Sequence, residues 1–138
     1  MNKKFFLIIC IILLIAVDLI SKYFIYDMHF LNKNYFITPI LNTGISWWIS
    51  IFHFNILIFL IPVILGIVIY LYYKKEIWYF SFIFIFAWWL ANFIDRLIYH
   101  WVRDFIDLHF FPIFNIADIF VSIWVLLILY SIYKKTSI

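Results

Sequence analysis

The sequence predicts an all-α membrane protein of four transmembrane helices, with a small strand-containing structure on the extracytoplasmic side, called here the cradle. Of its 138 residues, 69% are hydrophobic and only 12% are charged. Soluble domains are roughly half apolar and about a quarter charged. An ordinary water-soluble protein is therefore excluded. The length suits one integral membrane domain over residues 1–138, because lipid can cover the outside of a helix bundle.

Four apolar stretches are long enough to cross a bilayer, which takes about 20 helical residues. They cover residues 5–26, 54–73, 77–94 and 113–133. The first stretch follows two lysines, as a signal peptide would. However, no small-x-small cleavage motif follows, and the apolar pattern resumes past Asp18 as far as Tyr26. We therefore predict an uncleaved first span.

Lysine pairs predict the orientation of these spans. The three pairs are Lys3 with Lys4, Lys74 with Lys75, and Lys134 with Lys135, and each flanks an apolar stretch. The positive-inside rule then places both termini and the short turn between the second and third spans in the cytoplasm. The segments 27–53 and 94–112 fall on the outer side. The net charge of +3 therefore reports topology and indicates no nucleic-acid partner.

The outer segment 27–53 is expected to form the cradle. Turn formers such as Asn34, Pro39 and Asn42 alternate with short β-branched and aromatic runs such as Tyr35 to Thr38. This pattern is typical of short strands and turns, here resting on the outer leaflet.

Polar residues cluster at the outer ends of the spans and in the loop after the third span. A charged side chain deep in a bilayer costs about 2.5 to 3.5 kcal/mol, so acids there usually have a partner or a function. The clusters are Asp18 with Lys22; Asn92 with Asp95 and Arg96; Arg103 with Asp104 and Asp107; and Asn115 with Asp118. The predicted topology brings all four to one face of the membrane.

That convergence predicts an acid–base site. Two carboxylic acids close together and partly desolvated cannot both ionise cheaply, so one keeps its proton while the other stays charged. Such a pair can activate a water molecule and protonate a leaving amine, as aspartyl peptide hydrolysis requires. Spacing alone does not decide which two acids form the pair.

These clusters resemble the motifs of the lipoprotein signal peptidase family, also called signal peptidase II. Four blocks carry the resemblance in family order, from the first span to the last. They are Asp18 to Lys22; Asn42 to Gly44; Asn92 to Arg96 followed by Arg103 to Asp107; and Phe114 to Asp118.

The resemblance implies a catalytic pair formed by Asp104 and Asp118, which acts with no metal, no cofactor and no covalent intermediate. It implies that Asn92, Arg96 and Asn115 orient the pair or bind the substrate backbone. The residues that it implies to shape the site are Asp18, Lys22, Asn42, Gly44, Asp95 and Ala117.

The implied substrate is a diacylglyceryl-modified prolipoprotein, cut just before its lipidated cysteine. The implied setting is the bacterial inner membrane, with the active site facing the extracytoplasmic side. The expected partners are such prolipoproteins and membrane lipid, and the enzyme is expected to be a monomer.

Four positions depart from the family pattern. Ala91, Trp101 and Trp124 stand where the family has glycine, and Arg103 replaces a small apolar residue. These departures bear on the level of activity and on the substrate range more than on the fold.

Alternative functions fit less well. A zinc peptidase would need a motif such as His-Glu-x-x-His, which the sequence lacks, and a serine peptidase motif Gly-x-Ser-x-Gly is also missing. A proton-relay or transport protein would distribute charges through the membrane depth, yet residues 56–73 of the second span carry none. A catalytically weak or inactive family member that only binds lipoproteins stays open.

Overall fold

A computed structural model describes residues 2–27, 35–44, 54–75 and 78–136. Its elements, in chain order, are α1 (Lys3–Lys22), the π-helical turn η1 (Tyr23–Asp27), β1 (Ile37–Asn42), α2 (Phe54–Tyr73), α3 (Tyr79–Tyr99), β2 (Val102–Ile106) and α4 (Ile116–Thr136). The structure thus confirms the coarse prediction of a mainly helical protein with four helices and a small sheet. Residues 28–34 and 45–53 of the expected cradle lie outside the described residues.

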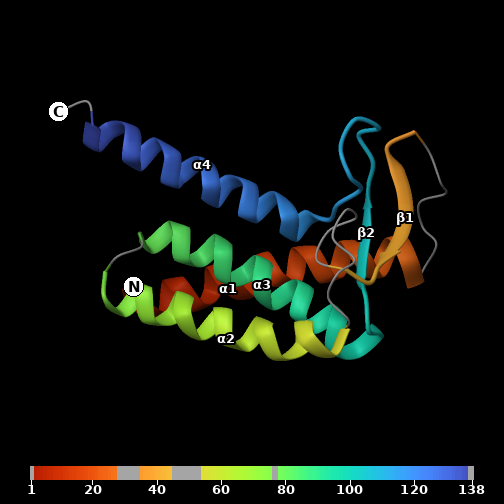
Figure 1. The fold of residues 1–138 in the computed structure, drawn as a ribbon, viewed down its shortest axis with the longest axis horizontal. Coiled ribbons are helices and arrows are strands. Elements are labelled where there is room, and N and C mark those ends of the chain that lie inside the picture. The colour runs from red at the N-terminus through yellow and green to blue at the C-terminus, as the bar shows by residue number, and fades with distance from the viewer. Residues whose placement is uncertain (1, 28–34, 45–53, 76–77, 137–138) are drawn as a thin grey trace.

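Helix α3 occupies the centre of the bundle and packs against α1, α2 and α4 (Figure 1). Small side chains allow α3 and α4 to approach closely. Ala87 and Ala91 on α3 and Ala117 on α4 are fully buried and form one apolar cluster with Phe120. A second apolar cluster joins α1, α2 and α3 through Ile11, Val68, Phe82, Ile83 and Ile85.

The outer surface of the bundle is apolar, as a lipid environment requires. Ile12, Val63 and Leu126 are among the large apolar side chains exposed on α1, α2 and α4. Within the described residues, Lys3–Tyr26 and Tyr79–Tyr99 are long and apolar enough to cross a membrane. The apolar stretches Phe59–Tyr73 and Ile116–Tyr130 of the other two helices are shorter.

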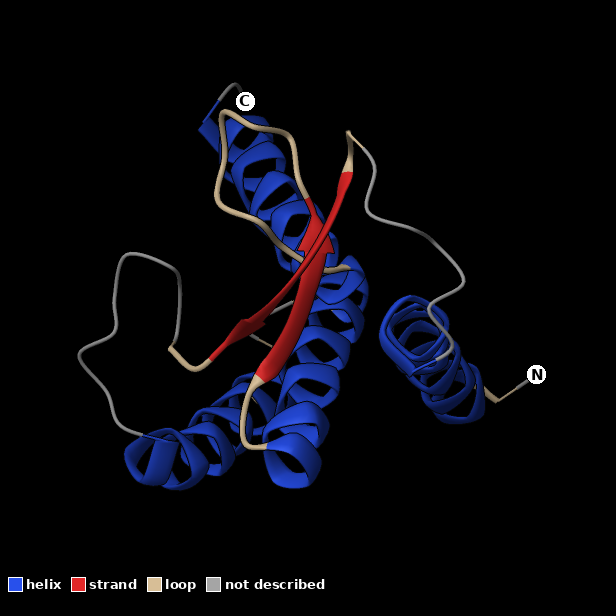
Figure 2. Ribbon diagram, turned by 90° about the vertical axis from the view of Figure 1, so that its right-hand side faces the viewer, coloured by secondary structure: helices blue, strands red, loops and turns tan. Residues whose placement is uncertain are grey.

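The two antiparallel strands lie across one end of the bundle (Figure 2). Leu41 pairs with Arg103 and Asn42 pairs with Val102, and the register shifts between Ile37 and Ile40. Pro39 lies in this irregular stretch, which suits a residue that cannot donate a hydrogen bond to a ladder.

The strand β2 also holds the start of α4. Phe114 and Ile106 form an isolated β-bridge, with an N–H from each donated to the carbonyl of the other at 2.8 and 3.1 Å. Asn115 follows directly, so the beginning of α4 is fixed beside β2.

The stretch after the expected third span differs from the prediction. Helix α3 continues past residue 94 to Tyr99, and residues 102–106 form a strand where a loop was expected. The helix stops at His100, which adopts left-handed backbone geometry with φ of 69°. The chain then reverses, and residues 102–106 pair with β1 in an antiparallel ladder. Asp95 and Arg96 therefore lie on α3, and Asp104 lies on β2.

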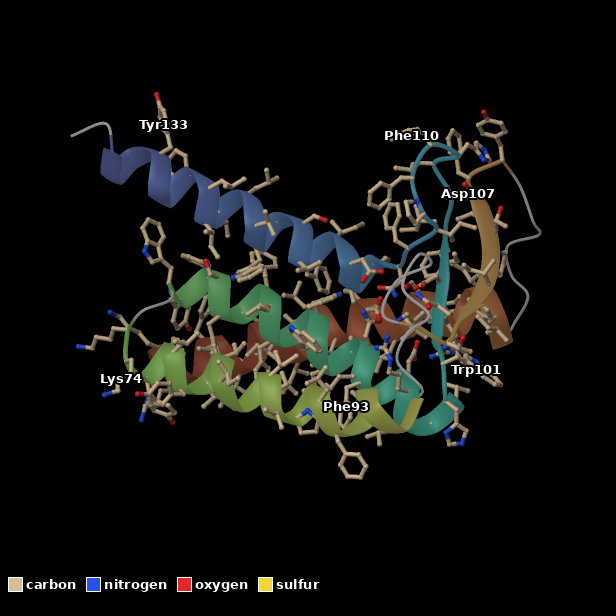
Figure 3. The ribbon with its side chains drawn as sticks, in the orientation of Figure 1. Lys74, Phe93, Trp101, Asp107, Phe110 and Tyr133 are labelled. Carbon is tan, nitrogen blue, oxygen red and sulfur yellow. The ribbon has the colours of Figure 1, made fainter. Side chains whose placement is uncertain are left out.

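The start of α1, the end of α4 and the turn that carries Lys74 lie at the end of the bundle opposite the sheet (Figures 1 and 3). Trp101 and Asp107 mark the sheet end in Figure 3. The three lysine pairs and the polar clusters thus lie at opposite ends of the helix bundle.

Candidate active site

Asp104 and Asp118 line one cavity of about 310 Å³ at the sheet end of the bundle. Asp104 comes from β2 and is 2% exposed, and Asp118 comes from the first turn of α4. Asn42, Asn92 and Asn115 line the same cavity, whose other walls are mostly apolar side chains of the helices and of residues 111–114. Two acids thus face a common space bordered by amides.

Asn115 joins the two acids. It sits just before α4, where its side-chain oxygen accepts the Asp118 N–H at 3.1 Å and its own N–H donates to Asp118 Oδ2 at 3.0 Å. This reciprocal pair is the hydrogen-bonding pattern of a capping box. The Asn115 side-chain amide donates to Asp104 Oδ1 at 2.6 Å and to Asn92 Oδ1 at 3.1 Å. The cap that begins α4 therefore also links both carboxylates.

The environment of Asp104 favours its protonated form. Burial raises its pKa to about 7, and the nearby charge of Asp118 acts in the same direction. Hydrogen bonds from Asn42 and Asn115 oppose the rise without cancelling it. Asn42 donates to Asp104 Oδ2 at 2.9 Å, and its own side-chain oxygen accepts the Gly44 N–H at 3.0 Å.

Asp118 is surrounded by hydrogen-bond donors. The indole N–H of Trp88 reaches Asp118 Oδ1 at 2.7 Å, and the side-chain amide of Asn92 reaches the same atom at 3.3 Å. Its other oxygen accepts from the Asn115 backbone. Both oxygens of Asp118 therefore act as hydrogen-bond acceptors.

A buried network of four charges supports the site. Lys22 pairs with Asp18 at 2.6 Å and with Asp95 at 3.1 Å, and Asp95 pairs with Arg103 at 2.9 Å. Because the two positive and two negative charges balance, no uncompensated charge is left within this network.

This network is connected to the surroundings of the two cavity acids at three points. Lys22 donates to Asn92 Oδ1 at 3.1 Å, and Asp18 accepts the Ala117 N–H at 2.8 Å in the first turn of α4. The Arg103 N–H donates to Asp95 at 3.1 Å, which fixes β2 directly before Asp104.

The comparisons with known proteins identify the family. The family model for signal peptidase (SPase) II matches residues 10–134. The chain belongs to the signal peptidase II family. This confirms the predicted family and the predicted activity, that of an aspartic peptidase that processes lipoproteins.

Relatives and solved structures agree with this membership of the signal peptidase II family. The chain is 35% identical to a lipoprotein signal peptidase of Thermodesulfovibrio yellowstonii, over 92% of this chain and 94% of that protein. It is 34% identical to the lipoprotein signal peptidase of Staphylococcus aureus, over 99% and 95%. Two bacterial membrane enzymes solved by the in meso method have similar folds, with TM-scores of 0.82 and 0.77. They are 32% and 31% identical, cover 95% and 93% of this chain, and are covered over 89% and 92% of their own lengths.

The structure brings the site residues predicted from the signal peptidase II motifs into one hydrogen-bonded assembly. Besides the contacts above, Arg96 on α3 donates to the Gly44 carbonyl at 2.9 Å and to the Asn92 carbonyl at 3.3 Å. These bonds hold the end of β1 against the bundle. The catalytic and supporting roles of these residues stay predictions.

The departures from the family pattern have local structural accounts. Arg103 is buried, and its guanidinium lies 4.2 Å from the centre of the Tyr99 ring in addition to pairing with Asp95. Ala91 fits fully buried between α3 and α4. Trp124 packs against the apolar cluster around Ile11 and Phe82. The backbone conformation that favours glycine occurs at His100, next to Trp101, and not at Trp101 itself.

Sequence reasoning missed two residues of the site, Tyr26 and Trp88. The hydroxyl of Tyr26 lies between the carbonyl oxygens of Ile40 on β1 and Asp104 on β2. Trp88 donates to Asp118. Helical spacing could have revealed both, because Tyr26 lies four residues after Lys22 and Trp88 lies four residues before Asn92.

Proposed function

We propose that Asp104 and Asp118 form the catalytic dyad of this signal peptidase II. The observation that carries the proposal is the position of Asn115, which hydrogen-bonds to both carboxylates inside one cavity. The raised pKa of Asp104, at about 7, supports unequal protonation of the two acids.

In the proposed reaction, ionised Asp118 acts as general base and protonated Asp104 acts as general acid. Asp118 takes a proton from a water molecule, whose oxygen attacks the scissile carbonyl carbon. The tetrahedral intermediate then collapses, the C–N bond breaks, and the proton of Asp104 passes to the leaving amine nitrogen. The products are a signal peptide with a new carboxylate and a lipoprotein with a new amino terminus. Proton exchange with water restores both acids.

Asn92, Asn115 and Arg96 are proposed to position this chemistry. Asn92 touches Asp118 and Asn115, so it fixes the spacing of the acids. Arg96 is bonded to the carbonyls of Gly44 and Asn92, and thereby holds the strand that carries Asn42. The buried charges of Asp18, Lys22 and Asp95 would keep α1 and α3 in register beneath the dyad.

The proposed substrate is a diacylglyceryl-modified prolipoprotein, cleaved just before its lipidated cysteine. The names of the related lipoprotein signal peptidases support this choice. So does the cavity, in which the acids meet apolar side chains that include Ile61 and Ile64 of α2 and Val121 of α4. An acyl-bearing segment entering from lipid could place its peptide bond beside the acids while its chains remain in apolar surroundings.

The proposed setting is the inner membrane of a bacterium, with four spans in a single domain and the enzyme as a monomer. Both termini would face the cytoplasm, and the dyad would face the extracytoplasmic side. The opposite placement of the Lys74 turn and the sheet end supports this orientation (Figure 3).

Cleavage of two matched synthetic peptides by the purified, detergent-solubilised protein tests the proposed substrate. One peptide carries a diacylglyceryl group on its cysteine, and the other carries a free cysteine. We expect mass spectrometry to find a cut directly before the lipidated cysteine, and little or no cut in the unmodified peptide. Cleavage at another bond, or equal rates for both peptides, would overturn the proposed substrate class.

A further inference from the structure

The indole of Trp88 makes the shortest hydrogen bond to Asp118 among those that the structure describes. Its N–H lies 2.7 Å from Asp118 Oδ1, compared with 3.3 Å for the Asn92 amide on the same oxygen. An indole N–H can only donate, so this bond needs an acceptor oxygen at that position. It is also stronger when the acceptor is charged.

The surroundings of Trp88 hold the indole in place. Its ring packs edge-on against Trp89, with ring centroids 4.7 Å apart, and it borders the apolar cluster formed by Ala87, Ala91 and Ala117. Trp88 also lines the cavity that contains both acids. Because the donor is on a packed ring of helix α3, its direction is set before any substrate arrives.

We propose that Trp88 is a positioning residue that holds Asp118 Oδ1 in the ionised, water-activating orientation. This inference rests on the proposed dyad and extends it to a residue outside the predicted set. Trp88 would act through Asp118, whereas Asn115 fixes the other oxygen and the neighbouring acid.

Other charged groups face the same carboxylate. Asp104 approaches from β2 and Arg96 from α3, and Lys22 of α1 reaches Asn92, which also touches Asp118. Helix α2 contributes the apolar side chains Ile61 and Ile64 to the cavity. Removing the indole N–H leaves these groups in place, so its effect on ionisation can be measured separately.

The test replaces Trp88 by phenylalanine and, in a second protein, by 3-benzothienylalanine, which keeps the bicyclic shape but has sulfur in place of N–H. Trp124→Phe is the matched control, because the Trp124 indole nitrogen is buried without a hydrogen-bond partner among the described residues. Each protein is assayed with the lipidated peptide over a range of pH, and its thermal stability in detergent is measured.

We expect both Trp88 variants to lose about tenfold in kcat, the factor that corresponds to one hydrogen bond to a charged group, with little change in KM. We also expect the acidic limb of the pH–rate profile to move up by about one pH unit, because the ionised acid loses a donor. Trp124→Phe should change neither quantity.

An unchanged kcat and pH profile in the benzothienyl variant would overturn the inference. Equal losses in Trp88→Phe and Trp124→Phe would also overturn it, because they would show a packing effect. Failure of the dyad proposal is a separate result, since it would appear as activity that survives in Asp104→Asn or Asp118→Asn.

Discussion

Asn115 donates its side-chain amide to Asp104 Oδ1 at 2.6 Å, so the residue that begins α4 also fixes an acid on β2. The same residue exchanges two hydrogen bonds with Asp118. The capping box that starts a helix is thus part of the proposed catalytic geometry. The side chain of Asn115 therefore belongs both to the helix boundary and to the proposed active site.

Asn115→Ala should lower kcat by about 100-fold, on the scale seen when a catalytic group is displaced by about 1 Å. The variant loses the bonds to Asp104, to Asn92 and to the Asp118 N–H, while the Asn115 backbone bond remains possible. Steady-state cleavage of the lipidated peptide measures the loss. Asn2→Ala is the matched control, because it removes the helix cap of α1 far from the dyad. Similar losses in both variants would show that capping alone matters.

The pH dependence of activity should follow the proton on Asp104. With its pKa raised to about 7, the general acid is protonated below this pH and loses its proton above it. We therefore expect kcat/KM to fall as pH rises through about 7. A rate that stays constant from about pH 6 to pH 9 would contradict the assignment of Asp104 as the acid.

The same shift predicts the direction of a stability change. An aspartate in the unfolded chain has a pKa near 3.8, below the folded value of about 7, so the folded state binds the proton more tightly. This contribution to stability is complete below about pH 4 and is lost as pH rises to about 7. Thermal unfolding of wild type and Asp104→Asn in detergent, compared at several pH values, should show this loss in the wild type only.

Removal of Arg103 should destabilise the fold strongly. Arg103→Ala would leave the buried Asp95 with Lys22 shared between two acids, and breaking such a pair costs about 3 to 5 kcal/mol. Denaturant unfolding in mixed micelles measures the loss. Lys74→Ala is the control, because this lysine is exposed and its contact with Tyr70 is a surface cation–π pair. We expect the double variant Arg103→Ala/Asp95→Asn to lose less stability than the sum of the losses in the two single variants. Additive losses would mean that Arg103 and Asp95 are not coupled.

The contact between α3 and α4 should tolerate only a small increase in side-chain volume. Ala91→Leu would insert a branched side chain into a fully buried contact and should destabilise by about 1 to 3 kcal/mol. Ala91→Gly, the residue that the family pattern favours, should cost only about 1 kcal/mol. Thermal unfolding compares the two, with Ile98→Ala on the exposed side of α3 as the control. Equal stability of Ala91→Leu and wild type would show that the two helices can separate there.

The four helices could be predicted from the sequence because a long apolar stretch in a membrane has few conformations other than a helix. The strand β2 was expected as a loop, since the short run from Val102 to Ile106 contains Arg103 and Asp104, which do not read as a strand. Its partner is β1, about sixty residues earlier in the chain, and this pairing has no local signal. Tertiary hydrogen bonding decided the conformation there.

The candidate site was predictable to the extent that its residues lie in the family motifs. The carboxylates, amides and Lys22 could be named, but their partners could not, because contacts such as Ala117 to Asp18 depend on how α1 and α4 meet. Trp88 and Tyr26 were missed, since aromatic residues are abundant in this chain and their polar atoms are a small part of each side chain.

The most direct test of the dyad is the activity of Asp104→Asn and Asp118→Asn on the lipidated peptide, with Asp107→Asn as a matched control. Asp107 is also an acid near the sheet end, but it pairs with His109 at 3.2 Å and does not line the cavity. We predict that cleavage before the lipidated cysteine disappears in both dyad variants and persists in Asp107→Asn, with all three proteins folded. Substantial cleavage by either dyad variant would contradict the assignment of Asp104 and Asp118.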